Sequence, residues 1–139
     1  MRVIDVMQRS VPTCGPGASA LEAARLLREE GAGLLVVVED GRPAGVLTDR
    51  DLVLKVMAEG LDPSAVMVGT LMSAPVITCQ PTEDIAPVVL RLEADGVRRC
   101  PVLSAENQVI GLLSVDDVNH TVARTLSGEL RDVLGALRR

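Results

Sequence analysis

Apolar and polar positions fall in short blocks along the chain, and the order of the blocks occurs twice. After Ser19, apolar residues follow at helical spacing up to Gly31, which predicts a helix capped by Ser19 and ended by Gly31. Short apolar runs at 34–38 and 44–47 predict two strands, and a second helix is predicted from 51 to about 60. The second half repeats this order, with a strand at 76–79, a helix at 83–95, strands at 99–103 and 109–113, and a helix from about 116.

The two halves also match residue by residue. Met72 follows Met7 by 65 positions, and the Val, Thr, Cys and Pro residues after each Met keep the same offset. The offset grows to 66 from Gly45 to Gly111, so one residue has been inserted between 103 and 111, in a polar segment that predicts a hairpin turn. A unit of about 60 residues buries little surface alone, so we expect the two copies to share one core around a pseudo-two-fold axis.

These patterns predict an α+β fold built of two βαββα repeats that pack through their sheets. We expect the first repeat at residues 1–62, the second at 63–122, and a helical tail at 123–139. The tail is predicted to lie on the module or on a partner chain, because it has one apolar face. That face consists of Leu126, Leu130, Val133, Leu134 and Leu137.

Composition narrows the function. The 139 residues include no Phe, Trp or Tyr and carry a formal net charge of −5, so a nucleic-acid partner is not expected. The apolar runs are too short for a membrane span, and the first residues lack a signal-peptide core, so a cytoplasmic protein is expected. Cys14, Cys79 and Cys100 fit neither a zinc motif nor a disulfide framework and are predicted to be small buried residues. A redox role stays open, because Cys14 and Cys79 occupy equivalent positions.

The strongest internal match is Gly45 to Leu52 with Gly111 to Val118. Each copy has a glycine, two apolar residues, a hydroxyl residue and an aspartate three positions later, where a strand becomes a helix. The hydroxyl and the acid can form a capping box at the helix start. The same pair can also hold a ligand, since a carboxylate accepts hydrogen bonds from both hydroxyls of a sugar diol and free N–H groups at a helix start favour a phosphate. The two roles can coexist, and both interpretations stay open.

Both halves resemble CBS domains, and the tandem resembles a CBS pair, or Bateman module, of the stand-alone bacterial type. The resemblance covers nearly the whole chain. It implies a regulatory sensor that binds an adenosyl compound, such as AMP, ADP, ATP, S-adenosylmethionine or an NAD-type dinucleotide, in a cleft between the repeats. The matching stretches are Ile4-Asp5-Val6-Met7, Thr13 to Ser19, the two signatures that end at Asp51 and Asp117, and Val97 to Val102.

The resemblance further implies that the signature acid binds the ribose and that the hydroxyl residue approaches ribose or phosphate. The two clefts differ, because Arg98 and Arg99 stand where the first repeat has Gly33 and Leu34. We therefore expect a phosphorylated adenosine to bind best at the second signature, opposite the first strand of repeat 1. The candidate ligand-binding residues are Thr48, Arg50, Asp51, Ser114, Asp117, Arg98, Arg99, Val11, Thr13 and Thr78.

No catalytic motif is found, and His120, the single histidine, has no nucleophile signature around it, so an enzyme is not expected. No metal or required cofactor is predicted. The alternative to a sensor is a CBS-fold interaction module that binds no ligand. Under both hypotheses we expect a homodimer and an unidentified downstream protein. The predicted dimer faces are Leu52, Val53, Val56 and Met57, with Val118, Val122 and Leu126.

Overall fold

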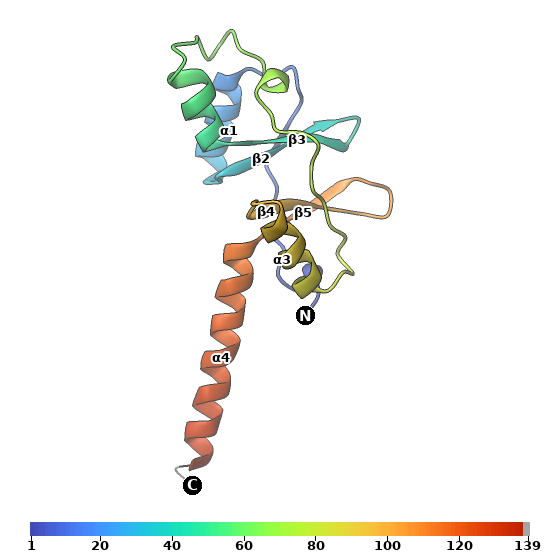
Figure 1. Cartoon of the computed structure of the whole chain (residues 1–139), viewed down its shortest axis with the longest axis vertical. Coiled ribbons are helices and arrows are strands. Elements are labelled where there is room, and N and C mark those ends of the chain that lie inside the picture. The colour runs from blue at the N-terminus through green and yellow to red at the C-terminus, as the bar shows by residue number, and fades with distance from the viewer. Residues whose placement is uncertain (138–139) are drawn as a thin grey trace.

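A computed structural model describes residues 1–137, with the side chains of all of these except 130, 131, 134 and 137. Each half of the chain forms a small sheet with helices against it, and the two halves stack on each other (Figure 1). The first half contains β1 (Thr13–Cys14), α1 (Ala20–Glu30), β2 (Leu34–Glu39), β3 (Arg42–Thr48), α2 (Asp49–Leu52) and the π-helical turn η2 (Val53–Met57). The second contains α3 (Ile85–Ala94), β4 (Arg99–Leu103), β5 (Val109–Ser114) and α4 (Val115–Leu137). Short 3-10 turns, η1 (Val3–Asp5) and η3 (Val68–Thr70), precede the two halves.

The predicted start and end of the first helix are confirmed. Ser19 Oγ accepts a hydrogen bond from the Glu22 N–H at 3.1 Å, and a Glu22 carboxylate oxygen accepts one from the Ser19 N–H at 3.2 Å. Gly31 ends α1 in the left-handed conformation, with φ of 60°. This helix therefore depends on local signals that are visible in the sequence.

Both predicted hairpins are present. The β2–β3 turn contains Asp40 and Gly41 at positive φ, and the β4–β5 turn contains Asn107 at positive φ. In the first sheet β1 lies parallel to β2, which pairs with β3 in antiparallel fashion, while the second sheet has only β4 and β5.

The strand predicted at 76–79 is wrong. This segment makes a single parallel bridge, between Cys79 and Val102. In the first repeat, the Val36 N–H donates to the Pro12 carbonyl at 3.0 Å and helps to hold the segment before β1 against β2. Pro101 stands in the position of Val36 and has no N–H to donate, so the equivalent bond is missing from the second repeat.

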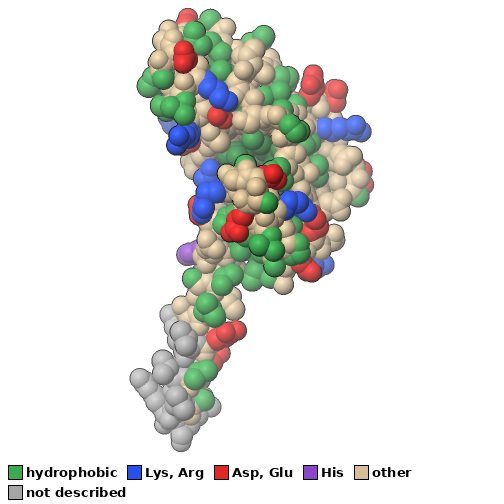
Figure 2. Space-filling model, viewed as in Figure 1, with side chains coloured by type: hydrophobic (Ala, Val, Ile, Leu, Met, Phe, Trp, Pro, Cys, Tyr) green, Lys and Arg blue, Asp and Glu red, His purple; other side chains and the backbone are tan. Residues whose placement is uncertain are grey.

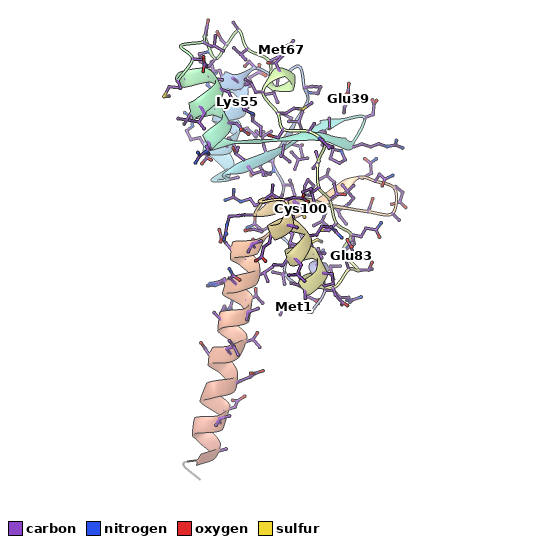
Figure 3. All side chains as sticks on the ribbon, in the orientation of Figure 1. Met1, Glu39, Lys55, Met67, Glu83 and Cys100 are labelled. Carbon is purple, nitrogen blue, oxygen red and sulfur yellow. The ribbon has the colours of Figure 1, made fainter. Side chains whose placement is uncertain are left out.

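Each repeat takes part of its core from the segment that precedes the other repeat. We call residues 3–7 and 68–72 the leading segments. Val3 and Met7 are buried among residues of the second repeat, such as Leu92, while Val68 and Leu71 are buried in the first. Figure 3 shows Met1 beside the lower end of α3, far from α1.

The backbone bonds of the leading segments reveal the pseudo-two-fold relation. The Val3 N–H donates to the Glu83 carbonyl at 2.9 Å, and the equivalent Val68 N–H donates to the Ala18 carbonyl at 2.8 Å. The bridges obey the same offsets: Arg2 with Asp84 matches Met67 with Ser19, and Gln8 with Leu112 matches Ser73 with Val46. Both leading segments therefore bind to their repeats by the same geometry, residues 3–7 to the second repeat and residues 68–72 to the first.

A third apolar cluster lies between the two sheets. Leu34 and Val36 of β2 are buried against Leu112 of β5. Val11, Val38, Val46 and Val109 pack around them. This cluster confirms the α+β fold of two repeats packed through their sheets.

Helix α4 extends away from the two repeats (Figure 1). Val115 and Val118 anchor its first turn in the second core, whereas Val122, Leu126 and Val133 expose 42%, 53% and 56% of their surface. The predicted position of the tail against the module is wrong, because α4 continues past residue 122 and away from the repeats (Figure 1), with these side chains exposed. The alternative, contact with a partner chain, stays a prediction. The side chains of Leu130, Leu134 and Leu137, which the predicted face included, lie outside the described ones.

Within residues 1–137, no helix combines the length and the apolar character needed to cross a membrane.

Candidate functional site

A cavity of about 400 Å³ opens between the two repeats. Its walls come from the segment before β1, from the turn between α1 and β2, and from the junction of β5 and α4 with the start of β4. The lining residues are Gln8, Ser10, Pro12, Glu30, Gly31, Ala32, Gly33, Leu34, Arg99, Leu112, Ser114, Asp116 and Asp117. Both repeats therefore contribute to one site.

The second signature faces this cavity. Ser114 ends β5, and its Oγ accepts a hydrogen bond from the Asp116 N–H at 3.2 Å. Asp117 lies in the first turn of α4, where Oδ2 accepts a hydrogen bond from Gln8 Nε2 at 3.0 Å. In the described part of the chain, Asp117 Oδ1 takes no hydrogen bond. The carboxylate is thus oriented by Gln8 and keeps one oxygen for a ligand.

The first signature is used for capping. Thr48 Oγ1 accepts from the Asp51 N–H at 3.1 Å, and Asp51 Oδ2 accepts from the Thr48 N–H at 2.9 Å. Asp51 Oδ1 also lies 3.3 Å from Lys55 Nζ, which donates to the Leu71 carbonyl at 2.8 Å. Both carboxylate oxygens of Asp51 therefore have protein partners. The second repeat has Thr121 in place of Lys55 and cannot form this ion pair.

The two arginines of the second repeat have different positions. Arg98 pairs with Asp116, and both side chains are mostly exposed. Arg99 is half-buried in the cavity wall, and its guanidinium lies against Gly33, where an added Cβ would be 3.3 Å from Nη2. Arg98 thus neutralises Asp116, which leaves Arg99 as the cation of the cavity.

The carboxylates of the cavity outnumber its cations. Glu30, Asp116 and Asp117 line it together with Arg99. Figure 2 shows blue and red side chains next to each other at the waist between the repeats, so opposite charges lie close together there. A ligand that fits this lining needs hydrogen-bond donors for the carboxylates and one negative group for Arg99.

Several residues of the predicted set do not line the cavity. Val11 packs against the cluster between the sheets, and Thr13 of β1 pairs with Val36 of β2. Ser10 and Pro12 face the cavity instead. In an extended segment adjacent side chains point to opposite sides, so Val11 and Thr13 face away from the cavity that Ser10 and Pro12 line. Arg50 is exposed on α2, and Thr78 lines a different surface pocket, where its carbonyl accepts from Arg91.

Sequence reasoning missed Gln8, Glu30 and the turn at 31–34. Gln8 could have been found from its position directly after Met7. The pseudo-two-fold relation places the residue at this position next to the signature of the other repeat. No local pattern indicated Glu30, because the end of α1 reaches the cavity only through the packing of the repeats.

The CBS domain family model matches residues 3–58 and 68–124. The chain belongs to the CBS domain family, with two CBS domains in tandem. Its relatives include the uncharacterized protein MK0525 of Methanopyrus kandleri, which is 36% identical over 115 residues. These residues are 82% of this chain and 59% of that protein. Hypoxic response protein 1 of Mycobacterium tuberculosis is 33% identical over 115 residues, which are 82% of this chain and 80% of that protein.

Solved structures share the fold. The structure of hypoxic response protein 1, which holds two coordinated zinc ions, aligns with a TM-score of 0.77 at 31% identity over 86% of this chain and 98% of that one. The CBS domain pair of protein MJ0100, solved with 5′-methylthioadenosine and S-adenosylmethionine, aligns with a TM-score of 0.80 at 21% identity over 90% of this chain and 98% of that one. Among the residues described for this chain, no three His, Cys, Asp or Glu side chains are grouped to hold a metal ion.

Proposed function

We propose that this CBS pair is a regulatory module that binds an adenosyl nucleotide in the cavity between its repeats. The observation that carries the proposal is Asp117, whose carboxylate is oriented by Gln8 and faces the cavity beside Arg99. The CBS pair of MJ0100, which binds adenosyl compounds, supports this ligand class.

The lining residues suit the three parts of such a ligand. Asp117 accepts hydrogen bonds from the ribose hydroxyls, and Arg99 pairs with a phosphate or carboxylate. The adenine lies between aliphatic side chains, since the chain has no aromatic residue. Pro12, Leu34 and Leu112 supply that apolar surface.

Ligand binding can regulate the packing of the module, because the ligand contacts both repeats at once. A ligand shifts the packing of the repeats, or of two chains, only by the difference between its affinities for the two arrangements. Residues 31–34 from one repeat and Ser114 and Asp117 from the other meet at this cavity. A change in the angle between the repeats therefore changes the site.

Asp117→Asn is expected to weaken nucleotide binding by about 10-fold or more, because a charge-assisted bond to the ribose is lost. Titration calorimetry with AMP, ATP and S-adenosylmethionine measures the loss. Asn keeps an oxygen that accepts from Gln8, so the fold is preserved. The matched control is Asp51→Asn, which keeps an oxygen for the Thr48 N–H but loses the ion pair with Lys55. It is expected to lower the melting temperature slightly and to leave binding unchanged.

Wild-type protein whose melting temperature does not change with any of the three ligands would overturn the proposal, since a ligand that binds the native state must stabilise it. Equal affinities in wild type and Asp117→Asn would overturn the assigned role of Asp117. Indifference to all three ligands would favour the alternative, an interaction module.

An apolar surface on the first repeat favours interaction with a second copy of the chain. Val53, Leu54 and Met57 of η2 expose 50%, 50% and 75% of their surface, and Val53 and Met57 line a hollow of about 430 Å³. Of the predicted dimer faces, Val56 and Val118 are buried in the two cores and are unavailable. We propose that the exposed residues of η2 form a homodimer contact.

Met57→Glu combined with Val53→Glu is expected to convert this dimer to a monomer, because each charge would have to be buried in an apolar contact. Light scattering coupled to size exclusion measures the mass. Ile110→Glu, at an exposed position on β5, is the control and should leave the mass unchanged. A monomeric wild type, or a double variant that stays dimeric, contradicts the contact.

A further inference from the structure

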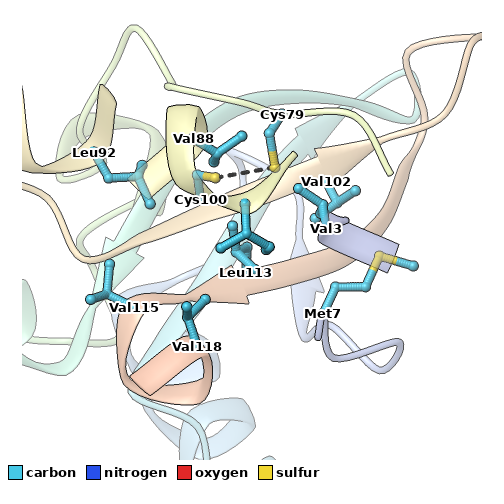
Figure 4. Packing of buried hydrophobic residues seen from close by; sticks show 11 residues of the cluster. Val3, Met7, Cys79, Val88, Leu92, Cys100, Val102, Leu113, Val115 and Val118 are labelled. Atoms are coloured by element: carbon cyan, nitrogen blue, oxygen red, sulfur yellow. Dashed lines mark hydrogen bonds between the residues drawn. The ribbon is translucent and has the colours of Figure 1, made fainter. Parts of the chain in front are cut away.

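Two cysteines of the second repeat lie within reach of each other. Their Sγ atoms are 3.5 Å apart, both thiols are free, and Cys79 and Cys100 expose 2% and 0% of their surface. Figure 4 shows the two side chains pointing toward each other among Val88, Leu92 and Leu113. They come from neighbouring backbone segments, because Cys79 bridges Val102 in the strand that contains Cys100.

One of the two cysteines borders a surface pocket. Cys79 contributes to a surface pocket of about 430 Å³, together with Thr78, Gln80, Glu83, Arg91, Leu103 and Asn107. Arg91 pairs with Glu83 at 3.2 Å and lowers the pKa of its carboxyl. The pocket is the side from which a small polar oxidant would approach the pair, because the opposite side is closed by the apolar core.

The first repeat provides an internal comparison. Cys14 occupies the position equivalent to Cys79, but Leu35 stands where the second repeat has Cys100. Burial and the nearby Glu22 raise the pKa of the Cys14 thiol, and the contact with Cys100 together with burial raises the pKa of the Cys79 thiol. The difference between Cys14 and Cys79 is therefore the second sulfur beside Cys79 and not the acidity of the thiol. The pairing of thiols is therefore a property of the second repeat.

We propose that Cys79 and Cys100 form a reversible disulfide site that is oxidised by hydroperoxides. The thiolate of one cysteine attacks a peroxide oxygen, so that an S–O bond forms, the O–O bond breaks and hydroxide leaves, giving a sulfenic acid. The second sulfur attacks the sulfenic sulfur, so that the S–S bond forms and the S–O bond breaks. Two thiols and one hydrogen peroxide thus give one disulfide and two waters, and a dithiol reductant returns the two electrons.

The new bond would tie together the two ends of the segment that carries α3. Cys79 precedes this helix, and Cys100 follows it in β4. A crosslink between them closes a loop in the unfolded chain and so stabilises the second repeat relative to the first.

The test uses the full chain with Cys14→Ser, so that only the pair can react. After treatment with hydrogen peroxide and then denaturation with an alkylating agent, the intact mass should fall by about 2 Da and no alkyl group should be added. Trypsin should then release peptides 56–91 and 100–124 as one linked species, which dithiothreitol separates. Peroxide treatment that leaves both thiols open to alkylation, or that adds oxygen without the linked species, overturns the proposal.

Cys100→Ala is the control and should lose both the mass change and the linked peptides. If this variant folds poorly, peptide mapping of the wild type decides alone, since the linked pair must contain Cys79 and Cys100. Linkage of Cys14 to either residue in the wild type would contradict the assignment.

Discussion

Removal of residues 1–7 is expected to destabilise the second repeat by about 4 kcal/mol, although these residues precede the first repeat in the chain. Val3 is completely buried and Met7 exposes 9% of its surface, both within the second core. The truncation also deletes two backbone bonds that hold the start of α3, from the Val3 N–H to the Glu83 carbonyl and from the Ile85 N–H to the Met1 carbonyl. The cost is high because both apolar burial and hydrogen bonds are lost.

Hydrogen exchange followed by residue locates the effect. The amides of α3, β4 and β5 should lose protection more than those of α1 and β2. Val68→Ala is the reciprocal control, since the fully buried Val68 belongs to the first core, and it should reduce protection in α1 and β2. Loss confined to the first repeat after the truncation would contradict the exchange of leading segments.

Gly111→Ala is expected to cost about 2 kcal/mol of folding stability, because an added Cβ has no space. It would lie 2.7 Å from the Met7 sulfur and 2.9 Å from the Gln8 carbonyl oxygen. At the equivalent Gly45, the three atoms nearest to the Cβ all belong to the Met72 side chain, and the Met72 sulfur is 2.6 Å away. A flexible side chain yields more easily than backbone, so Gly45→Ala should cost less.

Urea unfolding of the three proteins measures these differences. Gly128→Ala is a control of opposite sign, since an added Cβ at Gly128 in α4 meets nothing within 4 Å and Ala favours a helix over Gly by about 1 kcal/mol. Equal stability of Gly111→Ala and the wild type would show that the leading segment does not press on β5.

These two glycines change the interpretation of the signature. In the sequence, each glycine looked like part of a ligand-binding motif. In the structure, each one makes room for a methionine from the opposite leading segment, Met72 at Gly45 and Met7 at Gly111. The glycine therefore serves the packing of the pair, while the hydroxyl and the acid that follow serve the helix cap or the cavity.

Local features of the fold could be predicted because their causes are local. Ser19 caps α1 through Glu22, three residues away, and Asp40 with Gly41 turns the first hairpin. The exchange of leading segments could not be predicted, because an apolar residue such as Val3 shows that it is buried but not where. The absence of a strand at 76–79 could not be predicted from local sequence either. It depends on Pro101, which lies opposite residue 77 and has no N–H to donate to it.

The candidate site shows the same division. Sequence alone left capping and ligand binding open for both signatures. Two contacts separate them. Lys55, four residues after Asp51 and held by the Leu71 carbonyl, pairs with Asp51, while Gln8, which is far away in the sequence, orients Asp117 toward the cavity. The residue types were predicted, but which acid stays available depends on neighbours brought together by the fold.

The crossing of the leading segments also determines how the chain can be divided. A fragment that ends after residue 67 would contain the first sheet and α1 but would lack Val68 and Leu71, which complete that core. It would also carry Val3 and Met7 with no second repeat to receive them. Two such fragments can satisfy each other by inserting their own first residues into the partner, so halves of this protein should assemble as swapped dimers that imitate the intact pair.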